Sequence, residues 1–203
     1  MSAFTAARVI PLDKNPGVRP IAVGEVFRRV ICKSVMKVIE QDVLAATAPT
    51  QICVGIPSAC EAAVHAMDRL LNRSSVQGIL LVDASNAFNA LNRAAALHNT
   101  PRCCPSMAQI FKNTYTRRSR LFVSGGSEIL SKEGTCQGDP LAMAIYAVAI
   151  TPLIQRLAKA CPSTQQCWYA DDDGAGDDLV TLRKYWDELT RSGPGYGYNP
   201  NAT

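Results

Sequence analysis

Long hydrophobic runs and secretion signals are missing from this sequence. The most apolar stretch of the 203 residues, Leu141 to Ile154, is about 14 residues long, whereas a membrane-spanning helix needs about 20. The first residues have neither the apolar run nor the small-residue cleavage site of a secretory signal. We therefore expect an intracellular protein, in the cytoplasm or the nucleus, without a membrane partner.

Patterns typical of zinc sites are also missing. The eight cysteines include no Cys-x-x-Cys pair, and the two histidines, His65 and His98, lie far apart in the sequence. Structural zinc sites are built from closely spaced pairs of such ligands. Without a secretory signal, reduced thiols are expected rather than disulfides. The sequence thus argues against both a zinc site and a disulfide framework.

Charged residues are few, at 19% of the chain, while hydrophobic residues make up 47%. These values exclude intrinsic disorder and a charged coiled coil, and a chain of this length can bury a core in one domain or two small lobes. The predicted elements run strand, helices, hairpin, long helix, strand, helix. Because this order does not alternate as in a doubly wound sheet, we expect an α+β fold.

Periodicity and turn residues locate the elements. Short apolar runs predict a strand from Gly78 (GILLV), a strand from Gln166 (QCWYADD) and a hairpin around Gly125-Gly126. The first 18 residues are expected to form an extended loop, the acidic segment after the second strand a turn, and the C-terminal tail an irregular segment. Helical spacing covers residues 23–44, 58–71, 89–98, 105–118, 141–160 and 178–190.

Basic residues gather in the middle of the chain. Residues 84–127 contain no Asp or Glu. They include the basic residues Arg93 and Arg102 and the aromatic residue Tyr115. Lys and Arg can hold a phosphate backbone, and an aromatic ring can stack on a base. The sequence leaves open whether this stretch binds nucleic acid or is a solvated helix face. If it binds nucleic acid, the candidate contacts are Lys112, Arg117, Arg118 and Arg120.

Acidic residues crowd into DDDGAGDD, which begins at Asp171. A calcium loop of EF-hand type needs oxygen ligands at its fifth and twelfth positions, which here are Ala175 and Leu182. The EF-hand is therefore excluded. So many carboxylates in a short segment repel one another unless cations or solvent intervene.

Two predicted strands end in carboxylates. One strand leads into Asp83 and the other into Asp171 and Asp172. If the strands are neighbours in one sheet, the three carboxylates meet at one edge. Hard oxygen ligands suit Mg²⁺, and two such ions can serve an in-line phosphoryl transfer. The alternative is that each aspartate merely ends its strand or caps the following helix.

Several motifs occur together and in order: RPIAVGEVFRRVICK from Arg19, VDASNAF from Val82, QGDPL from Gln137 and YADD from Tyr169. Through this set the chain resembles the reverse transcriptase family, and it is most similar to the enzymes of non-LTR retroelements. The resemblance implies an RNA-directed DNA polymerase, a nucleotidyltransferase that adds dNTPs to a primer 3′-OH on an RNA or DNA template. It also implies two Mg²⁺ ions, with Mn²⁺ as a substitute.

The same resemblance implies roles for individual residues. Asp83, Asp171 and Asp172 would be the catalytic metal ligands, and the carbonyl of Ala84 would complete a site. Phe88 would lie against the sugar and favour deoxynucleotides. The remaining nucleotide contacts would be Arg19 on the triphosphate, with Lys14 as a weaker candidate, and Gln137, Gly138 and Tyr169.

The resemblance further implies a fingers-like segment over residues 1–75. The palm would span residues 76–203, with part of the fingers inserted around residues 95–130. The thumb and the lysine-bearing motif that follow the palm in the family are expected outside these residues, in a retrotransposon polyprotein. Lys184 is not a substitute for that lysine, because it lies on the preceding helix. No oligomeric state is predicted.

Two features depart from the family's pattern. Asp173 follows the aspartate pair where a small or apolar residue is usual, and it is expected either to disturb the metal ions or to point to solvent. The string Gly176-Asp177-Asp178 matches the GDD motif of viral RNA-dependent RNA polymerases. A helical pattern follows it, however, so we expect Asp177 to be an N-cap.

Two other functions stay open at this point. One is a nucleic-acid-binding remnant that keeps the fold but cannot polymerise. The other is a divalent-cation nuclease or phosphotransferase that uses the same carboxylates.

Overall fold

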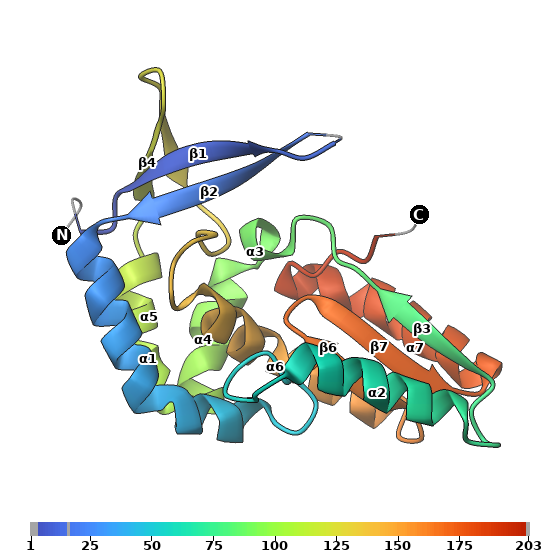
Figure 1. Ribbon diagram of the computed structural model, residues 1–203. Coiled ribbons are helices and arrows are strands. Elements are labelled where there is room, and N and C mark those ends of the chain that lie inside the picture. The colour runs from blue at the N-terminus through green and yellow to red at the C-terminus, as the bar shows by residue number, and fades with distance from the viewer. Residues whose placement is uncertain (1–3, 16, 202–203) are drawn as a thin grey trace.

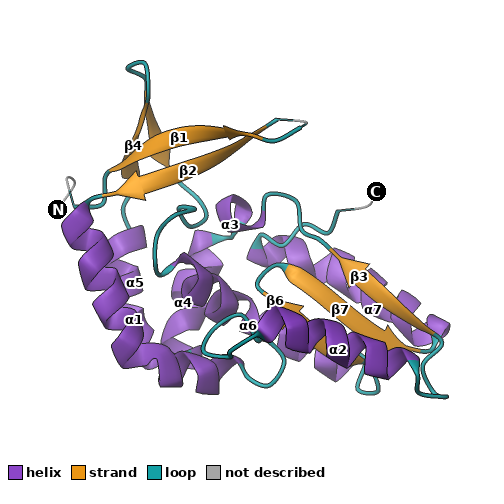
Figure 2. Ribbon diagram, viewed as in Figure 1, coloured by secondary structure: helices purple, strands orange, loops and turns teal. Residues whose placement is uncertain are grey.

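Two sheets occupy opposite ends of the molecule, with helices around and between them (Figures 1 and 2). The computed structural model describes residues 4–15 and 17–201. The first sheet has the strand order β2-β1-β4-β5, and only its β1–β4 pair is parallel. Its strands are β1 (Ala7–Asp13), β2 (Val18–Gly24), β4 (Ser119–Val123) and β5 (Glu128–Ser131).

The β1–β2 hairpin lies where the sequence predicted an extended loop. Pro11, Pro16 and Gly17 made the first 18 residues read as a loop, because proline cannot donate a ladder hydrogen bond. In the structure Pro11 lies opposite Pro20 across the hairpin. The hairpin around Gly125-Gly126 is confirmed as the β4–β5 turn.

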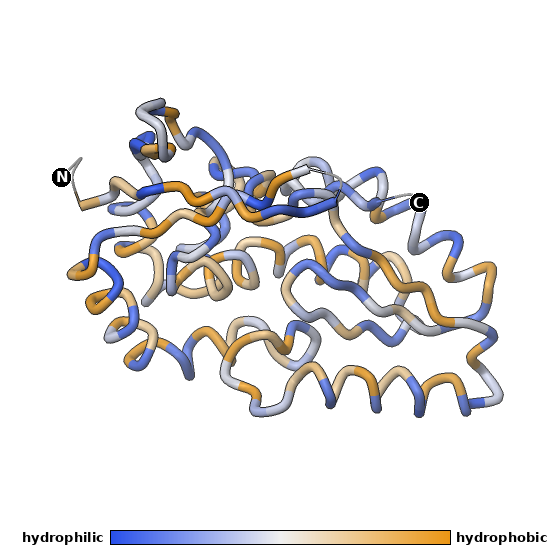
Figure 3. The backbone as a smooth tube through the Cα atoms, turned by 45° about the horizontal axis from the view of Figure 1, so that its top comes forward, coloured by the Kyte–Doolittle hydropathy of each residue, from blue (hydrophilic) through white to orange (hydrophobic). Residues whose placement is uncertain are grey.

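The second sheet has the order β3-β7-β6 and is antiparallel throughout. Its strands are β3 (Gly78–Val82), β6 (Gln165–Tyr169) and β7 (Asp172–Asp177). Both predicted apolar strands are therefore confirmed, and β3 is a continuous hydrophobic run in Figure 3.

The central strand β7 was wrongly predicted as a turn. Its sequence, DDGAGD, is composed almost entirely of residues that are depleted in strands. Gly174 and Gly176 let neighbouring side chains come close: a Cβ at Gly176 would lie 2.8 Å from Ile79 Cδ1, and one at Gly174 would lie 3.0 Å from Met67 Sδ of α2. The glycines thus suit a buried strand covered by α2, a tertiary contact that no local pattern reveals.

The long apolar helix α6 is confirmed and forms the centre of the core. Twelve of its residues are buried, and α1, α4 and α7 pack against it. Around the second sheet, α2 covers one face and α7 the other (Figure 1). The helices are α1 (Val26–Thr47), α2 (Ala59–Leu71), α3 (Ala87–Ala90), α4 (Arg93–Cys103), α5 (Pro105–Tyr115), α6 (Ala142–Ala160) and α7 (Leu179–Ser192), with a 3₁₀ turn at Gly193–Tyr196.

None of the described helices has both the length and the apolar character of a membrane span. No disulfide joins any of the eight cysteines, all of which lie within the described residues.

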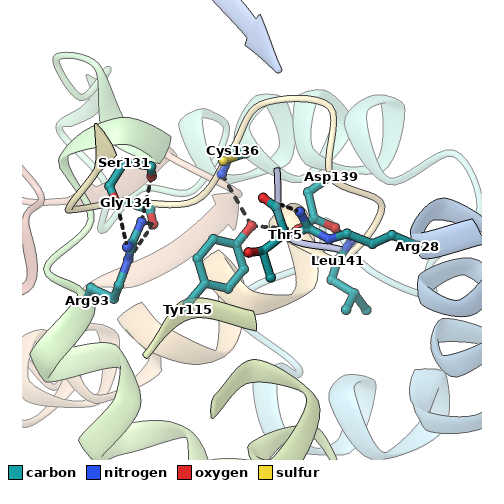
Figure 4. Close-up of polar contacts among 9 residues, drawn as sticks. All are labelled: Thr5, Arg28, Arg93, Tyr115, Ser131, Gly134, Cys136, Asp139 and Leu141. Carbon is teal, nitrogen blue, oxygen red and sulfur yellow. Dashed lines mark hydrogen bonds and ion pairs between the residues drawn. The ribbon is translucent and has the colours of Figure 1, made fainter. Parts of the chain in front are cut away.

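A buried ion pair connects three parts of the chain (Figure 4). Arg28 of α1 pairs with Asp139, which precedes α6, and their side chains are 4% and 2% exposed. The Tyr115 hydroxyl, at the end of α5, donates to Asp139 Oδ2 at 2.6 Å, and the Leu141 N–H donates to Oδ1 at 3.0 Å. One carboxylate therefore holds α1, α5 and the start of α6 together.

We expect Asp139→Ala to lower the free energy of unfolding by about 3–5 kcal/mol, because Arg28 would remain buried without a counter-charge. Urea denaturation measures this change. The control is Asp187→Ala, which removes the exposed Arg183–Asp187 pair on α7 and should cost less than about 1 kcal/mol. Equal effects of the two variants would contradict the role given to Asp139.

Candidate active site

The turn between β6 and β7 is clamped by residues distant in sequence. Ala170 in this turn has a φ of +55°, which is strained for a residue other than glycine. The fully buried Gln51 side chain donates from Nε2 to the Ala170 carbonyl at 2.9 Å and accepts from the Ala170 N–H at 2.8 Å. The Tyr198 hydroxyl donates to the Asp171 carbonyl at 2.9 Å. These three bonds hold the turn that presents Asp171.

Three predicted carboxylates meet at this edge of the sheet. In the β3–β7 register Val82 lies opposite Asp173, so the end of β3 lies beside the start of β7. Burial raises the pKa of Asp171, and the charges of Asp172 and Asp83 raise it further, while a backbone hydrogen bond and Arg19 oppose the rise. Burial and then Asp83 also raise the pKa of Asp172. The aspartates are thus close enough to repel one another.

This donor set fits a hard divalent cation. The ligands offered are carboxylates, which suit Mg²⁺ or Mn²⁺ rather than a thiolate-binding metal, and a cation would relieve the repulsion among them. Among the described residues, no three His, Cys, Asp or Glu side chains are placed so that together they could hold a metal ion.

The backbone beside Asp83 is held by the C-terminal segment. Asn201 N–H donates to the Asp83 carbonyl and Ser85 N–H donates to the Asn199 carbonyl, each at 2.8 Å. Both bonds flank Ala84, so its own carbonyl takes no part in this pairing. A Cβ on Gly197 (φ +79°) would lie only 2.0 Å from a carbonyl oxygen of α3. The predicted irregular tail is therefore fixed against the site.

A cleft of about 570 Å³ brings most of the predicted nucleotide-site residues together. It lies between the β1–β2 hairpin and the carboxylate edge, so cations face carboxylates across it. The residues from the prediction that line it are Lys14, Arg19, Asp83, Ala84, Phe88, Gln137 and Asp171.

The segment before α6 carries Gln137 and Gly138. The Ala22 N–H of β2 donates to the Gln137 carbonyl at 2.7 Å, and Gln137 Oε1 is buried without a hydrogen-bond partner among the described residues. Gly138 has a φ of +104°, and a Cβ there would lie 2.7 Å from the Ala22 carbonyl oxygen. Gly138 therefore sits against β2 and not in the lining of the cleft.

Arg93 holds the other end of this segment (Figure 4). Its guanidinium donates to the carbonyls of Ser131, Glu133 and Gly134 at 2.8–3.1 Å and lies 5.2 Å from the centre of the Tyr115 ring. Arg93 is 6% exposed. It is thus a structural residue and not part of an exposed basic track.

Other predicted residues lie elsewhere. Tyr169 lies beside Cys60 of α2, where a hydrogen bond to that thiol and burial raise its pKa, and it does not line the cleft. Asp172 lies next to the cleft, in a neighbouring hollow that also contains Asp83.

The predicted nucleic-acid contacts lie away from the cleft. Lys112, Arg117 and Arg118 line a separate hollow, whereas Arg120 is paired with Glu128 at 3.1 Å.

Asp173 does not point to solvent, so that expectation for it was wrong. It is 2% exposed, its Oδ2 accepts from the Tyr185 hydroxyl at 2.7 Å, and burial raises its pKa to about 8.

The N-cap of α7 is Asp178, and the prediction that Asp177 is the N-cap was wrong. Asp177 ends β7 and accepts from Ser163 and Thr164.

Residues 12–173 match the family model described as reverse transcriptase (RNA-dependent DNA polymerase). This chain belongs to the reverse transcriptase family. The predicted fold class is thereby confirmed: the reverse transcriptase is an α+β protein of the fingers and palm type, and its family comprises RNA-dependent DNA polymerases.

Solved structures agree with this fold. The reverse transcriptase chain is similar to an apo telomerase from Candida tropicalis truncated from its C-terminal domain, with a TM-score of 0.70 and 15% identity over 99% of this chain and 49% of that one. A Candida albicans telomerase in complex with the TWJ fragment of telomeric RNA gives a TM-score of 0.73 and 11% identity over 97% and 40%. The chain thus spans half or less of these structures. A comparison with curated proteins gave no match.

Sequence reasoning missed Gln51 and Tyr198. Each lies far along the chain from the turn it holds, and no local pattern distinguishes a buried glutamine or tyrosine of this kind. Their role follows only from the tertiary contacts.

We expect Gln51→Leu to speed hydrogen exchange at the Ala170 amide and to lower the free energy of unfolding by about 1–3 kcal/mol, because two buried backbone groups lose their partner. Exchange mass spectrometry and urea denaturation measure these effects. Gln109→Leu, which changes an exposed glutamine on α5, should leave both unchanged. Unaltered exchange at Ala170 in Gln51→Leu would refute the clamp.

Proposed function

We propose that this reverse transcriptase chain performs RNA-directed DNA synthesis, adding dNTPs to a primer 3′-OH on an RNA or DNA template. The observation that carries the proposal is the cleft in which Asp83 and Asp171 face Arg19 and Lys14. Carboxylates on one side and cations on the other are what a metal-bound triphosphate requires.

The carboxylates provide the centre of the mechanism. Asp83, Asp171 and Asp172, with the Ala84 carbonyl, would hold two Mg²⁺ ions, which supply Lewis-acid stabilisation of the attacking and leaving oxygens. The clamped turn keeps Asp171 in place, so the chain's contribution is positioning and neutralisation of charge.

The cleft walls orient the nucleotide. Arg19 binds the triphosphate, with Lys14 beside it, because the planar guanidinium suits phosphate oxygens. Phe88 lies against the sugar, and Gln137 lies against the nucleotide from the cleft lining. Tyr169 and Gly138 contribute indirectly, at the turn and at the contact with β2.

The domain division is part of the proposal. Residues 1–75 with the insertion around 95–130 form the fingers, and the rest of residues 76–203 forms the palm. The division is supported by the two separate sheets. The motifs beginning at Val82 and Tyr169 support an origin in a non-LTR retrotransposon polyprotein.

Template strands have a candidate contact outside the cleft. Lys112, Arg117 and Arg118 line a hollow of about 300 Å³ near the end of α5, and none of the described residues that line it is acidic. We propose that this hollow, with Arg120 beside it on β4, binds the phosphate backbone of the nucleic acid.

Asp171→Asn should reduce Mg²⁺-dependent primer extension by at least about a hundredfold, because the metal ions supply several kcal/mol of charge stabilisation. Single-nucleotide incorporation on a primed RNA template measures the rate. Asp187→Asn, an exposed change on α7, is the matched control. Unchanged extension by Asp171→Asn would refute the site. Binding of nucleic acid by the wild-type chain without any extension would favour the non-polymerising remnant. Degradation of nucleic acid by the wild-type chain without dNTP incorporation would favour the nuclease.

Replacing Lys112, Arg117 and Arg118 together by Gln should lower the magnitude of the slope of log K against log salt by about 2–3, since each phosphate contact contributes about 0.7–0.9. Fluorescence anisotropy of a labelled primed template over a KCl series measures the slope. Arg183→Gln on α7 removes an exposed charge elsewhere and should leave it unchanged. If the triple variant keeps the wild-type slope, the hollow does not bind the backbone.

A further inference from the structure

Tyr146 of α6 lies directly under the cleft. It was not among the site residues predicted from the sequence. Its side chain is 0% exposed. Its ring centre lies 4.8 Å from that of Phe88, with 31° between the ring planes. Phe88 lines the cleft, so Tyr146 is the buried support behind it.

The hydroxyl end of Tyr146 lies on the side of the catalytic carboxylates. Burial raises the pKa of Tyr146 well above its ordinary value, and the charges of Asp171, Cys53, Asp172 and Asp83 raise it further. The hydroxyl is buried and has no hydrogen-bond partner among the described residues. The ring, and not a hydrogen bond from the hydroxyl, is therefore what Tyr146 contributes.

The two partners of this ring contact differ in how firmly they are held. Tyr146 lies in the 19-residue helix α6, most of which is buried. Phe88 belongs to α3, a single turn of four residues that cannot be stable by itself. The Thr135 N–H donates to the Phe88 carbonyl at 2.7 Å and fixes its backbone. The position of the Phe88 ring then depends on Tyr146.

We propose that Tyr146 is a positioning residue for sugar discrimination, because its ring fixes Phe88 against the 2′ position of the incoming nucleotide. The inference rests on the proposed polymerase function. A ring can reject a hydroxyl by its bulk only if it cannot move aside, and close packing behind it provides that resistance. Without the Tyr146 ring behind it, the Phe88 ring would move aside when a ribonucleotide binds, and a deoxynucleotide would still bind as before.

The test compares Tyr146→Leu with Tyr146→Phe in single-nucleotide incorporation, using dNTP and rNTP on the same primed template. Tyr146→Leu should lower the dNTP-to-rNTP ratio of kcat/KM by about three- to tenfold, the range expected for loss of one aromatic pair. The change should arise mainly from a lower KM for the rNTP. Tyr146→Phe should keep the wild-type ratio, because the hydroxyl has no partner to lose.

Leu153→Ala is the matched control, since Leu153 is also 0% exposed on α6 and its loss leaves a comparable core cavity. It should lower Tm without changing the ratio. If Tyr146→Leu does not fold, Tyr146→Met replaces it, with the same expected ratio. A wild-type ratio in an active Tyr146→Leu or Tyr146→Met enzyme overturns the inference, as does an equal loss in Tyr146→Phe. Failure of the wild-type chain to incorporate any dNTP would instead refute the polymerase proposal.

Discussion

The buried ion pair between Arg28 and Asp139 is the interaction on which the arrangement of this reverse transcriptase chain depends. Two charges removed from water are costly unless each is fully paired and hydrogen-bonded, and Asp139 meets this condition by accepting from Arg28, Tyr115 and the Leu141 N–H. The segment that carries Asp139 also holds Gln137 against β2. The pair therefore fixes the first sheet, with its cations, relative to the helices that support the carboxylates.

The second constraint is electrostatic. Burial, and then the charges of neighbouring carboxylates, raise the pKa values of Asp171 and Asp172, so the proximity of these two aspartates to Asp83 is unfavourable for the fold alone. The clamp from Gln51 and Tyr198 holds the turn in spite of this cost. An unfavourable cluster held by dedicated hydrogen bonds is typical of a functional site. A divalent cation bound by these carboxylates would offset the repulsion between them.

Much of the fold could be predicted from local patterns, and the failures have definite causes. The apolar periodicity of α6 and the hydrophobic run of β3 are strong signals, because twelve residues of α6 are buried and β3 is a short, uninterrupted apolar run. The strand β7 was missed because its glycines serve a contact with α2, which lies elsewhere in the sequence. The β1–β2 hairpin was missed because Pro11, Pro16 and Gly17 are typical of a loop. Within the site, the carboxylates stood out as motifs, whereas Gln51, Tyr198 and Tyr146 act through contacts that only the folded chain creates.

The central claim is that the aspartates at two strand ends form one divalent-cation site that faces a nucleotide cleft. The most direct measurement is anomalous scattering from Mn²⁺ in crystals of the chain bound to a primed template and a non-hydrolysable dNTP analogue. The account predicts anomalous density between Asp83 and Asp171, with the triphosphate beside Arg19. Mn²⁺ density only at other positions, with the analogue bound in the cleft, would contradict it.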